Sequence, residues 1–86
     1  MTKIIEKDGY TFKVRIYNLN DSISYTIEVK KKFLFFYIWE TVDEYDSKLY
    51  GVIYAKAGTI IERIQKKIND YIYTQNEFTE ICNYLK

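Results

Sequence analysis

The side chains that could carry chemistry in this chain are few in kind. Its 86 residues include no His and a single Cys, Cys82. His is the commonest general base, and His and Cys supply the usual protein ligands of zinc, copper and haem. The three glycines stand apart from one another, so the sequence has no Gly-rich phosphate-binding motif. We therefore expect a protein that is not an enzyme and holds no metal and no cofactor, with Cys82 as a buried, inert thiol.

Carboxylates crowd one stretch of the chain, at Glu40, Asp43, Glu44 and Asp46. Grouped carboxylates can bind a hard cation or act as general acid and base, but the calcium-loop pattern Asp-x-Asp-x-Asp-Gly is missing from the sequence. Acidic residues ahead of a helix also interact favourably with its dipole. We interpret the stretch as a turn before a helix, and its functional alternative is that Asp43 and Glu44 contact a protein partner.

An aromatic row is the sharpest feature, because every second residue from 33 to 39 carries a ring: Phe33, Phe35, Tyr37 and Trp39. Alternate residues of a strand share one face, and four exposed rings would offer a few hundred Å² of apolar surface. Aromatic residues also dominate binding hot spots. Three interpretations are open: burial under the terminal helix or a second copy of the chain, contact with a protein partner assisted by Lys30 and Lys32, and stacking of bases.

Basic residues near this row define the nucleic-acid alternative, in which Lys13, Arg15 and Lys30 would contact phosphates. Aromatic residues between cations on a sheet face bind single-stranded nucleic acid by stacking and phosphate contact. Glu28 interrupts this pattern, and the sequence contains no RNP-type motif. Lysines at a hairpin tip more often serve solubility and protect a strand edge. Nucleic acid is therefore the less favoured partner.

Length and composition bound the rest. A length of 86 residues, of which 48% are hydrophobic, predicts a single domain over residues 1–86. The formal net charge of +1 is too small for the protein to bind nucleic acid, or to mimic it, by bulk charge alone. No apolar run is long enough to span a membrane, and the first residues do not resemble a signal peptide, so we expect a cytoplasmic protein without membrane contact. The excess of Lys over Arg, with many Ile, Tyr and Asn, suggests an AT-rich bacterial or phage genome.

The elements that would position these residues begin with strands. Alternating apolar and polar residues predict antiparallel strands at about 3–7, 10–17, 23–30 and 33–41. Asp8-Gly9 is a dipeptide that type I′ hairpin turns favour, since both central residues need a positive φ. We place Lys31-Lys32 at the tip of the last hairpin. Ile27 then lies opposite Phe36, and the core face collects Leu34, Phe36 and Ile38, while the aromatic row takes the other face.

The second half predicts two helices. Isoleucines at helical spacing extend over about 48–73, and a capping-box pattern at Thr59–Glu62 allows a start only at 59. Residues 48–57 also fit an alternating strand. A second capping box, Thr74–Glu77, predicts a terminal helix over 75–85. The apolar stripe of that helix is Phe78, Ile81, Cys82 and Leu85.

The predicted fold class is therefore α+β: a three- to four-stranded antiparallel meander followed by two helices, with the longer one packed on one sheet face. The predicted core is Phe12, Val14, Ile27, Phe36, Ile60, Ile64 and Ile68. We expect a small protein-binding module with an exposed aromatic face, such as an inhibitor or accessory protein of a phage or mobile element. Its partner is a protein of unknown identity, and self-association into a homodimer is a version of this idea.

Overall fold

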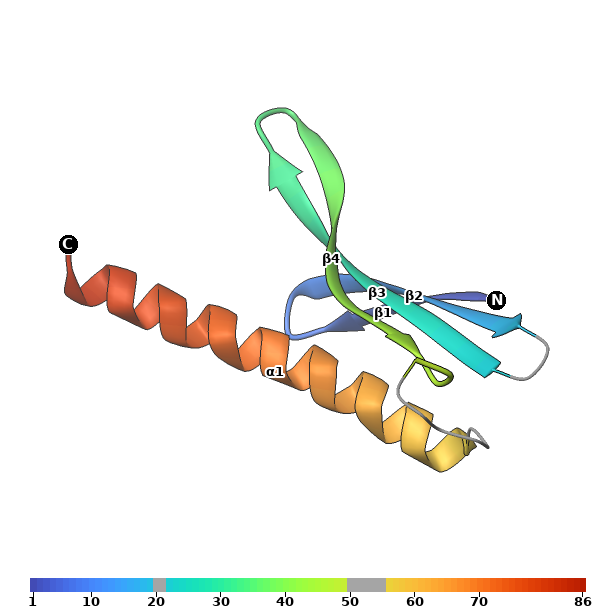
Figure 1. Ribbon diagram of the computed structural model, residues 1–86. Coiled ribbons are helices and arrows are strands. Elements are labelled where there is room, and N and C mark those ends of the chain that lie inside the picture. Colours follow the sequence, from blue (N-terminus) through green and yellow to red (C-terminus); the bar gives the residue numbers. More distant parts are fainter. Residues whose placement is uncertain (20–21, 50–55) are drawn as a thin grey trace.

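The computed structural model describes residues 1–19, 22–49 and 56–86. Four antiparallel strands form one meander sheet, in which the order of the strands is their order in the sequence. They are β1 (Thr2–Lys7), β2 (Tyr10–Leu19), β3 (Ser22–Phe33) and β4 (Phe36–Asp46). The helix α1 (Ala57–Tyr84) follows and packs on one face of this sheet (Figure 1). We call that face the helix side and the other the open face. The α+β class and the antiparallel sheet are thus confirmed.

The predicted pair of helices is wrong, because the described residues contain one continuous helix of 28 residues. Residues 74–77 lie inside α1, where the Thr79 hydroxyl donates to the Gln75 carbonyl at 3.0 Å. Neither Gly nor Pro interrupts this stretch, so a capping-box pattern alone does not end a helix. The predicted cap at Thr59 is also wrong, since the N-cap residue is Lys56 and makes no side-chain capping bond. Lys48 and Leu49 lie in a turn, and residues 50–55 of the ambiguous segment fall outside the described residues.

The first hairpin turns where the sequence predicted. Lys7 pairs with Tyr10, and Asp8 and Gly9 between them have φ values of 51° and 83°. Both values are positive, as a type I′ turn requires. The Asp8-Gly9 turn is therefore confirmed.

The last hairpin turns three residues later than predicted, so the predicted register is wrong. Phe33 pairs with Phe36, and Leu34-Phe35 forms the turn instead of Lys31-Lys32. Tyr25 consequently pairs with Tyr45 rather than with Ile38. Neither Leu nor Phe favours a turn, and a run that is apolar on both faces leaves the register weakly specified by its pattern.

An irregularity interrupts the β3–β4 ladder partway along. Ile27 pairs with Asp43 and Glu28 pairs with Thr41, so Val42 is an extra residue on β4. Such a bulge bends the strand and increases its twist. Beyond it, the hairpin leaves the rest of the sheet and projects from the molecule (Figure 1).

The core lies between the sheet and the first half of α1. Isoleucines at i, i+4 spacing bury one stripe of the helix, at Ile60, Ile64, Ile68 and Ile72. Tyr71 adds edge-on ring contacts to Tyr10 and Phe12, with centroids 5.6 and 5.7 Å apart. The predicted core residues are buried except Phe36, which is 53% exposed because it lies in the projecting hairpin, and Leu34 and Ile38, which were also predicted to face the core, are exposed there as well.

The remainder of α1 extends past the sheet as a second projection (Figure 1). Its apolar side chains there are largely exposed: Tyr73, Phe78, Ile81, Tyr84 and Leu85. The radius of gyration of 15.2 Å exceeds the roughly 12 Å expected for a compact domain of this length. The molecule is therefore a small packed centre that carries two arms, the hairpin and the C-terminal half of α1.

Candidate functional site

The end of the β3–β4 hairpin is the most exposed apolar surface of the described chain. We call residues 33–38 the hairpin tip. Phe35 is 99% exposed and Leu34 is 69% exposed, and Phe33, Phe36, Tyr37 and Ile38 are exposed as well. Because an aromatic side chain can bury about 150–250 Å², the tip offers several hundred Å² for contact. Surfaces of this size on small soluble proteins mark interaction sites.

The backbone at the tip is unfavourable for its sequence. Leu34 adopts a φ of 57°, in the left-handed region that a non-Gly residue enters at a cost of about 1–3 kcal/mol. The Asp8-Gly9 turn of the same chain shows the residue types that suit such a conformation. The Leu34 side chain is 69% exposed and is not part of the core. The tip thus keeps large apolar residues where folding alone favours Asn, Asp or Gly.

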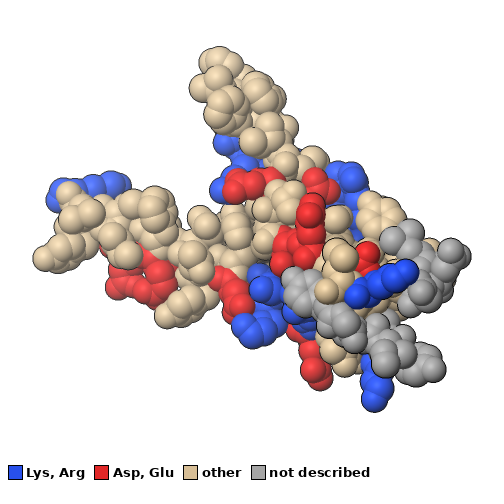
Figure 2. Space-filling model, in the orientation of Figure 1, with Lys and Arg blue, Asp and Glu red and all other residues tan. Residues whose placement is uncertain are grey.

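Lysines surround the base of the tip. Lys30 Nζ lies 4.6 Å from the centre of the Tyr37 ring, and Lys31 Nζ lies 2.7 Å from a Glu40 carboxylate oxygen. The hydrogen bond to Glu40 is the largest of the effects that raise the pKa of Lys31. Figure 2 shows the end of the hairpin without charged side chains in this view, with both basic and acidic side chains beneath it. The arm therefore combines an apolar end with a cationic collar, Lys30, Lys31 and Lys32.

The predicted aromatic row does not lie on one face, because the turn is at Leu34-Phe35. Tyr37 and Trp39 pair with Lys32 and Lys30 on the open face. Phe33 lies on the helix side, where its ring meets Phe36 with centroids 5.6 Å apart. Phe35 occupies the turn itself. The terminal part of α1 covers none of Phe33, Phe35 and Tyr37, which are exposed, whereas Trp39 is half-buried.

The three cations of the nucleic-acid alternative each have a contact within the chain. Lys13 Nζ lies 4.0 Å from the centre of the Trp39 ring, and Arg15 Nε lies 3.7 Å from a Glu28 carboxylate oxygen. Lys30 lies over Tyr37. A base that stacked on Trp39 or Tyr37 from the lysine side would have to displace that lysine. On the open face, the Trp39 and Tyr37 rings are thus already in contact with lysines of the same chain.

The acidic stretch is part of strand β4 and not a turn before a helix, so that interpretation is wrong. Asp43 accepts a hydrogen bond from the Tyr25 hydroxyl at 2.6 Å. Burial, followed by this contact, raises the pKa of Tyr25 far above its usual value. Asp43 therefore serves the core. Glu44 is exposed on the open face beside Thr26, far along the strand from the tip.

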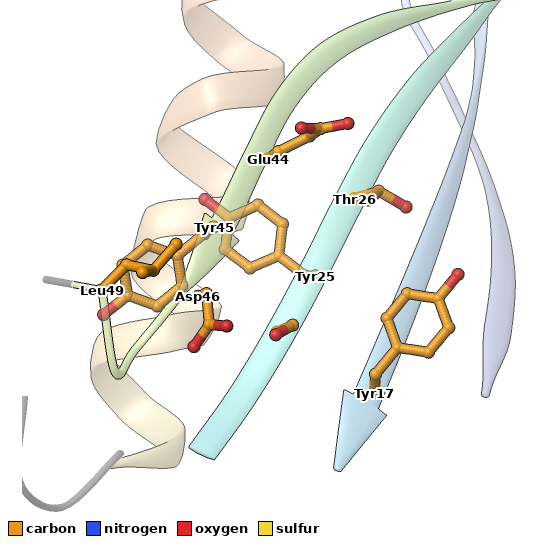
Figure 3. A pocket seen from close by; sticks show the side chains of 8 residues that line it. Tyr17, Tyr25, Thr26, Glu44, Tyr45, Asp46 and Leu49 are labelled. Atoms are coloured by element: carbon orange, nitrogen blue, oxygen red, sulfur yellow. The ribbon is translucent and has the colours of Figure 1, made fainter. Parts of the chain in front are cut away.

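A depression of about 480 Å³ lies at the other end of the sheet (Figure 3). Its carboxylates are Glu44 and Asp46, and an Asp46 oxygen accepts the Lys48 backbone N–H at 3.0 Å. The other lining residues are Tyr17, Ser24, Tyr25, Thr26, Tyr45 and Leu49. Residues 1–19, 22–49 and 56–86 bring together no group of three His, Cys, Asp or Glu that could hold a metal ion.

The C-terminal half of α1 is the surface that sequence reasoning missed. The stripe Phe78, Ile81, Cys82 and Leu85 is apolar as predicted, but it was assigned to a separate, packed helix. In the structure it belongs to the same helix as the buried isoleucines and lies past the edge of the sheet, where Phe78, Ile81 and Leu85 are exposed and Cys82 is half-buried. The signal was the length of the periodic pattern, which outruns what four short strands can cover.

Comparison with protein-family models, curated proteins and solved structures finds no match to this chain. Among the described residues, no helix has both the length and the apolar character needed to cross a membrane. The geometry of the two arms is therefore the basis for a functional assignment.

Proposed function

We propose that this protein is a non-enzymatic protein-binding module whose contact surface is the hairpin tip. One observation carries the proposal: Leu34-Phe35 is an exposed apolar turn with a left-handed Leu34. Strained residues that the fold does not need cluster at functional sites. Lys30 and Lys32 form a polar rim around Phe33, Phe35 and Tyr37, in the manner of interfaces with an apolar centre.

The biological setting follows from this chemistry. A protein with exposed apolar arms and this hairpin tip would act by covering a surface of another protein. An inhibitor or accessory protein of a phage or mobile element, working in the cytoplasm, is the role that we propose. We assign Asp43 a role in the stability of the fold and not in partner contact, because its carboxylate accepts a hydrogen bond from the core residue Tyr25. Glu44 lies too far from the tip to share one small interface with it.

The test is site-specific photo-cross-linking in cells that produce the protein. p-Benzoylphenylalanine replaces Phe35 at the tip, or Tyr17, which is 42% exposed near the other end of the sheet. We expect discrete protein adducts from position 35 and none from position 17. Equal adducts from both positions, or none from position 35, would contradict the proposal.

Single-stranded nucleic-acid binding by Lys13, Arg15 and Lys30 remains the alternative proposal, and it has less support because Lys13 and Lys30 already lie over Trp39 and Tyr37. An oligonucleotide shift assay at low and high salt separates the two, since phosphate contacts weaken steeply with salt. We expect no shift at low salt. A shift that salt abolishes and that Lys13→Ala weakens would favour the alternative.

A further inference from the structure

We propose that the partner of the hairpin tip is a second copy of this chain: each hairpin packs on the C-terminal half of the other copy's α1. This inference rests on the proposed function, because it names the protein that the tip contacts. It assigns one occupant to two exposed surfaces of the same molecule, the tip and residues 73–85.

The hairpin offers both faces of its end for this contact: Tyr37, Lys30 and Lys32 on the open face and an apolar set on the helix side. Phe33, Phe36 and Ile38 share that side, because they alternate with the residues that face away from α1. Lys31, on the same side, has its Nζ 6.0 Å from the centre of the Tyr71 ring, which fixes the orientation. Phe35 extends this apolar surface at the turn.

The helix offers a matching apolar stripe. Phe78, Ile81 and Leu85 follow i, i+3, i+7 spacing and so lie along one side of α1. This stripe lies further along α1 than the buried residues Ile60, Ile64, Ile68 and Ile72 and is rotated from them about the helix axis, by about half a turn between Ile72 and Ile81. The apolar side chains of α1 beyond the sheet are therefore left exposed in the monomer.

Charge complementarity favours a dimer in which the hairpin of one copy contacts the helix of the other over a dimer in which the two hairpins contact each other. Residues 30–38 include three lysines and no acidic residue, whereas residues 73–85 include Glu77 and Glu80 and no Lys or Arg. In the described chain no ion pair is formed by Lys32, Glu77 or Glu80. The last turn of α1 also lacks a basic residue, so a lysine from a second copy would complement its dipole.

Size and symmetry complete the case. Because both surfaces belong to one chain, a two-fold axis would generate the contact twice and cover both arms of both copies. Each contact can bury several hundred Å² on either side. Two of them pass the roughly 1,200 Å² of total area that a specific interface needs.

The primary test is a charge swap followed by sedimentation equilibrium on the full chain. The wild type is expected at twice the chain mass of 10.4 kDa. Lys30→Glu/Lys32→Glu places like charges in both contacts, and so does Glu77→Lys/Glu80→Lys, so each variant is expected to be monomeric. An equimolar mixture of the two variants restores opposite charges in both contacts and is expected to dimerise. Circular dichroism checks that each variant is folded.

A second pair of variants tests the apolar part. Ile81→Ser is expected to weaken dimerisation by about tenfold or more. Ile61→Ser is the matched control, since Ile61 is 53% and Ile81 is 57% exposed on the same helix. The control should leave the dimer intact, and equal effects of the two changes would contradict the assignment.

Other occupants of the tip are distinguishable outcomes. A wild type that stays at 10.4 kDa at every concentration refutes the inference, and so does a dimer that persists in both charge-reversed variants. A monomer that still cross-links through position 35 to another protein leaves the proposed function standing. A third outcome is a monomer that yields no protein adduct from position 35 and co-sediments with anionic vesicles, with Phe35→Ser abolishing the co-sedimentation. That outcome refutes both the dimer and the protein-binding function, and it assigns the tip to a membrane surface.

Discussion

Among the described residues with positive φ, Gly9 and Leu34 are opposite cases. Gly9, with a φ of 83°, suits its turn, and Leu34, with a φ of 57°, does not. We expect Leu34→Gly to leave stability unchanged or raise it by about 1 kcal/mol, because relief of strain outweighs the extra freedom of Gly in the unfolded chain. Chemical denaturation measures this. A loss of 2 kcal/mol or more, roughly what a buried residue contributes, would show that the Leu34 side chain supports the fold.

The opposite substitution, which replaces a Gly of positive φ by an L-residue, can be made at Gly9 in the first hairpin. Nothing lies within 4 Å of a Cβ built on Gly9, so Gly9→Ala meets no steric obstacle. We still expect a loss of about 1–2 kcal/mol, because an L-residue resists this φ. The same denaturation experiment applies, and an unchanged midpoint would mean that the turn relaxes to another type.

Tyr25 makes the stability of the fold sensitive to alkaline pH. Its raised pKa means that the folded protein retains the phenol proton more firmly than the unfolded chain does. This contribution is fully present below the unfolded pKa of about 10 and is lost as pH rises above it. We expect thermal stability to fall steeply above that pH.

Tyr25→Phe is the control for this effect. The variant lacks the hydrogen bond to Asp43 and should be less stable by about 1–3 kcal/mol at neutral pH. Its deficit should shrink as pH rises past about 10. Parallel curves for the two proteins would show that other groups control the alkaline transition.

At the scale of elements, α1 combines a half that the fold needs and a half that it does not. Ile68 is buried against the sheet and Ile81 is exposed. Ile68→Ala should cost about 2–5 kcal/mol, whereas Ile81→Ala should change the stability of dilute protein by no more than about 0.5 kcal/mol. Thermal unfolding of both variants at low concentration measures the difference. Equal losses would mean that the end of α1 is packed in the monomer.

Element types were predictable where local signals agree with the fold. Alternation over 10–17 and 23–30 and the turn pair Asp8-Gly9 all point to the same hairpins. The Leu34-Phe35 turn was not predictable, because residues 33–39 are apolar throughout and contain no turn-forming residue. The single long helix was missed because Thr74–Glu77 matches a cap by type, while only tertiary context decides whether the backbone uses it.

The candidate surface was predictable in composition but not in shape. Exposure of Phe33, Phe35 and Tyr37 follows from a hairpin that outgrows its sheet, which no local pattern encodes. The division of the row between two faces depends on the register, and a shift of the turn redistributes the rings. The unpartnered end of α1 is a property of the whole molecule.

At that scale, the two arms should share a concentration dependence. Amides of residues 33–38 and 75–85 lie outside the core and should exchange rapidly with deuterium in dilute solution. Both segments should gain protection together at high concentration, because dimerisation covers them simultaneously. Hydrogen exchange followed by mass spectrometry measures this, with residues 12–16 as the internal reference. Protection gained by one segment alone would contradict a reciprocal contact.

The extra residue Val42 determines the direction in which the hairpin tip points. The extra residue leaves every neighbouring pair of β3 and β4 matched, yet it bends the strand at that point. A chain without it would keep the same tip but hold the rings nearer the plane of the sheet, and it would lose the packing of Val42 against the core. One inserted residue thus sets the angle at which the tip approaches a partner, and its deletion would redirect the tip at a cost in stability.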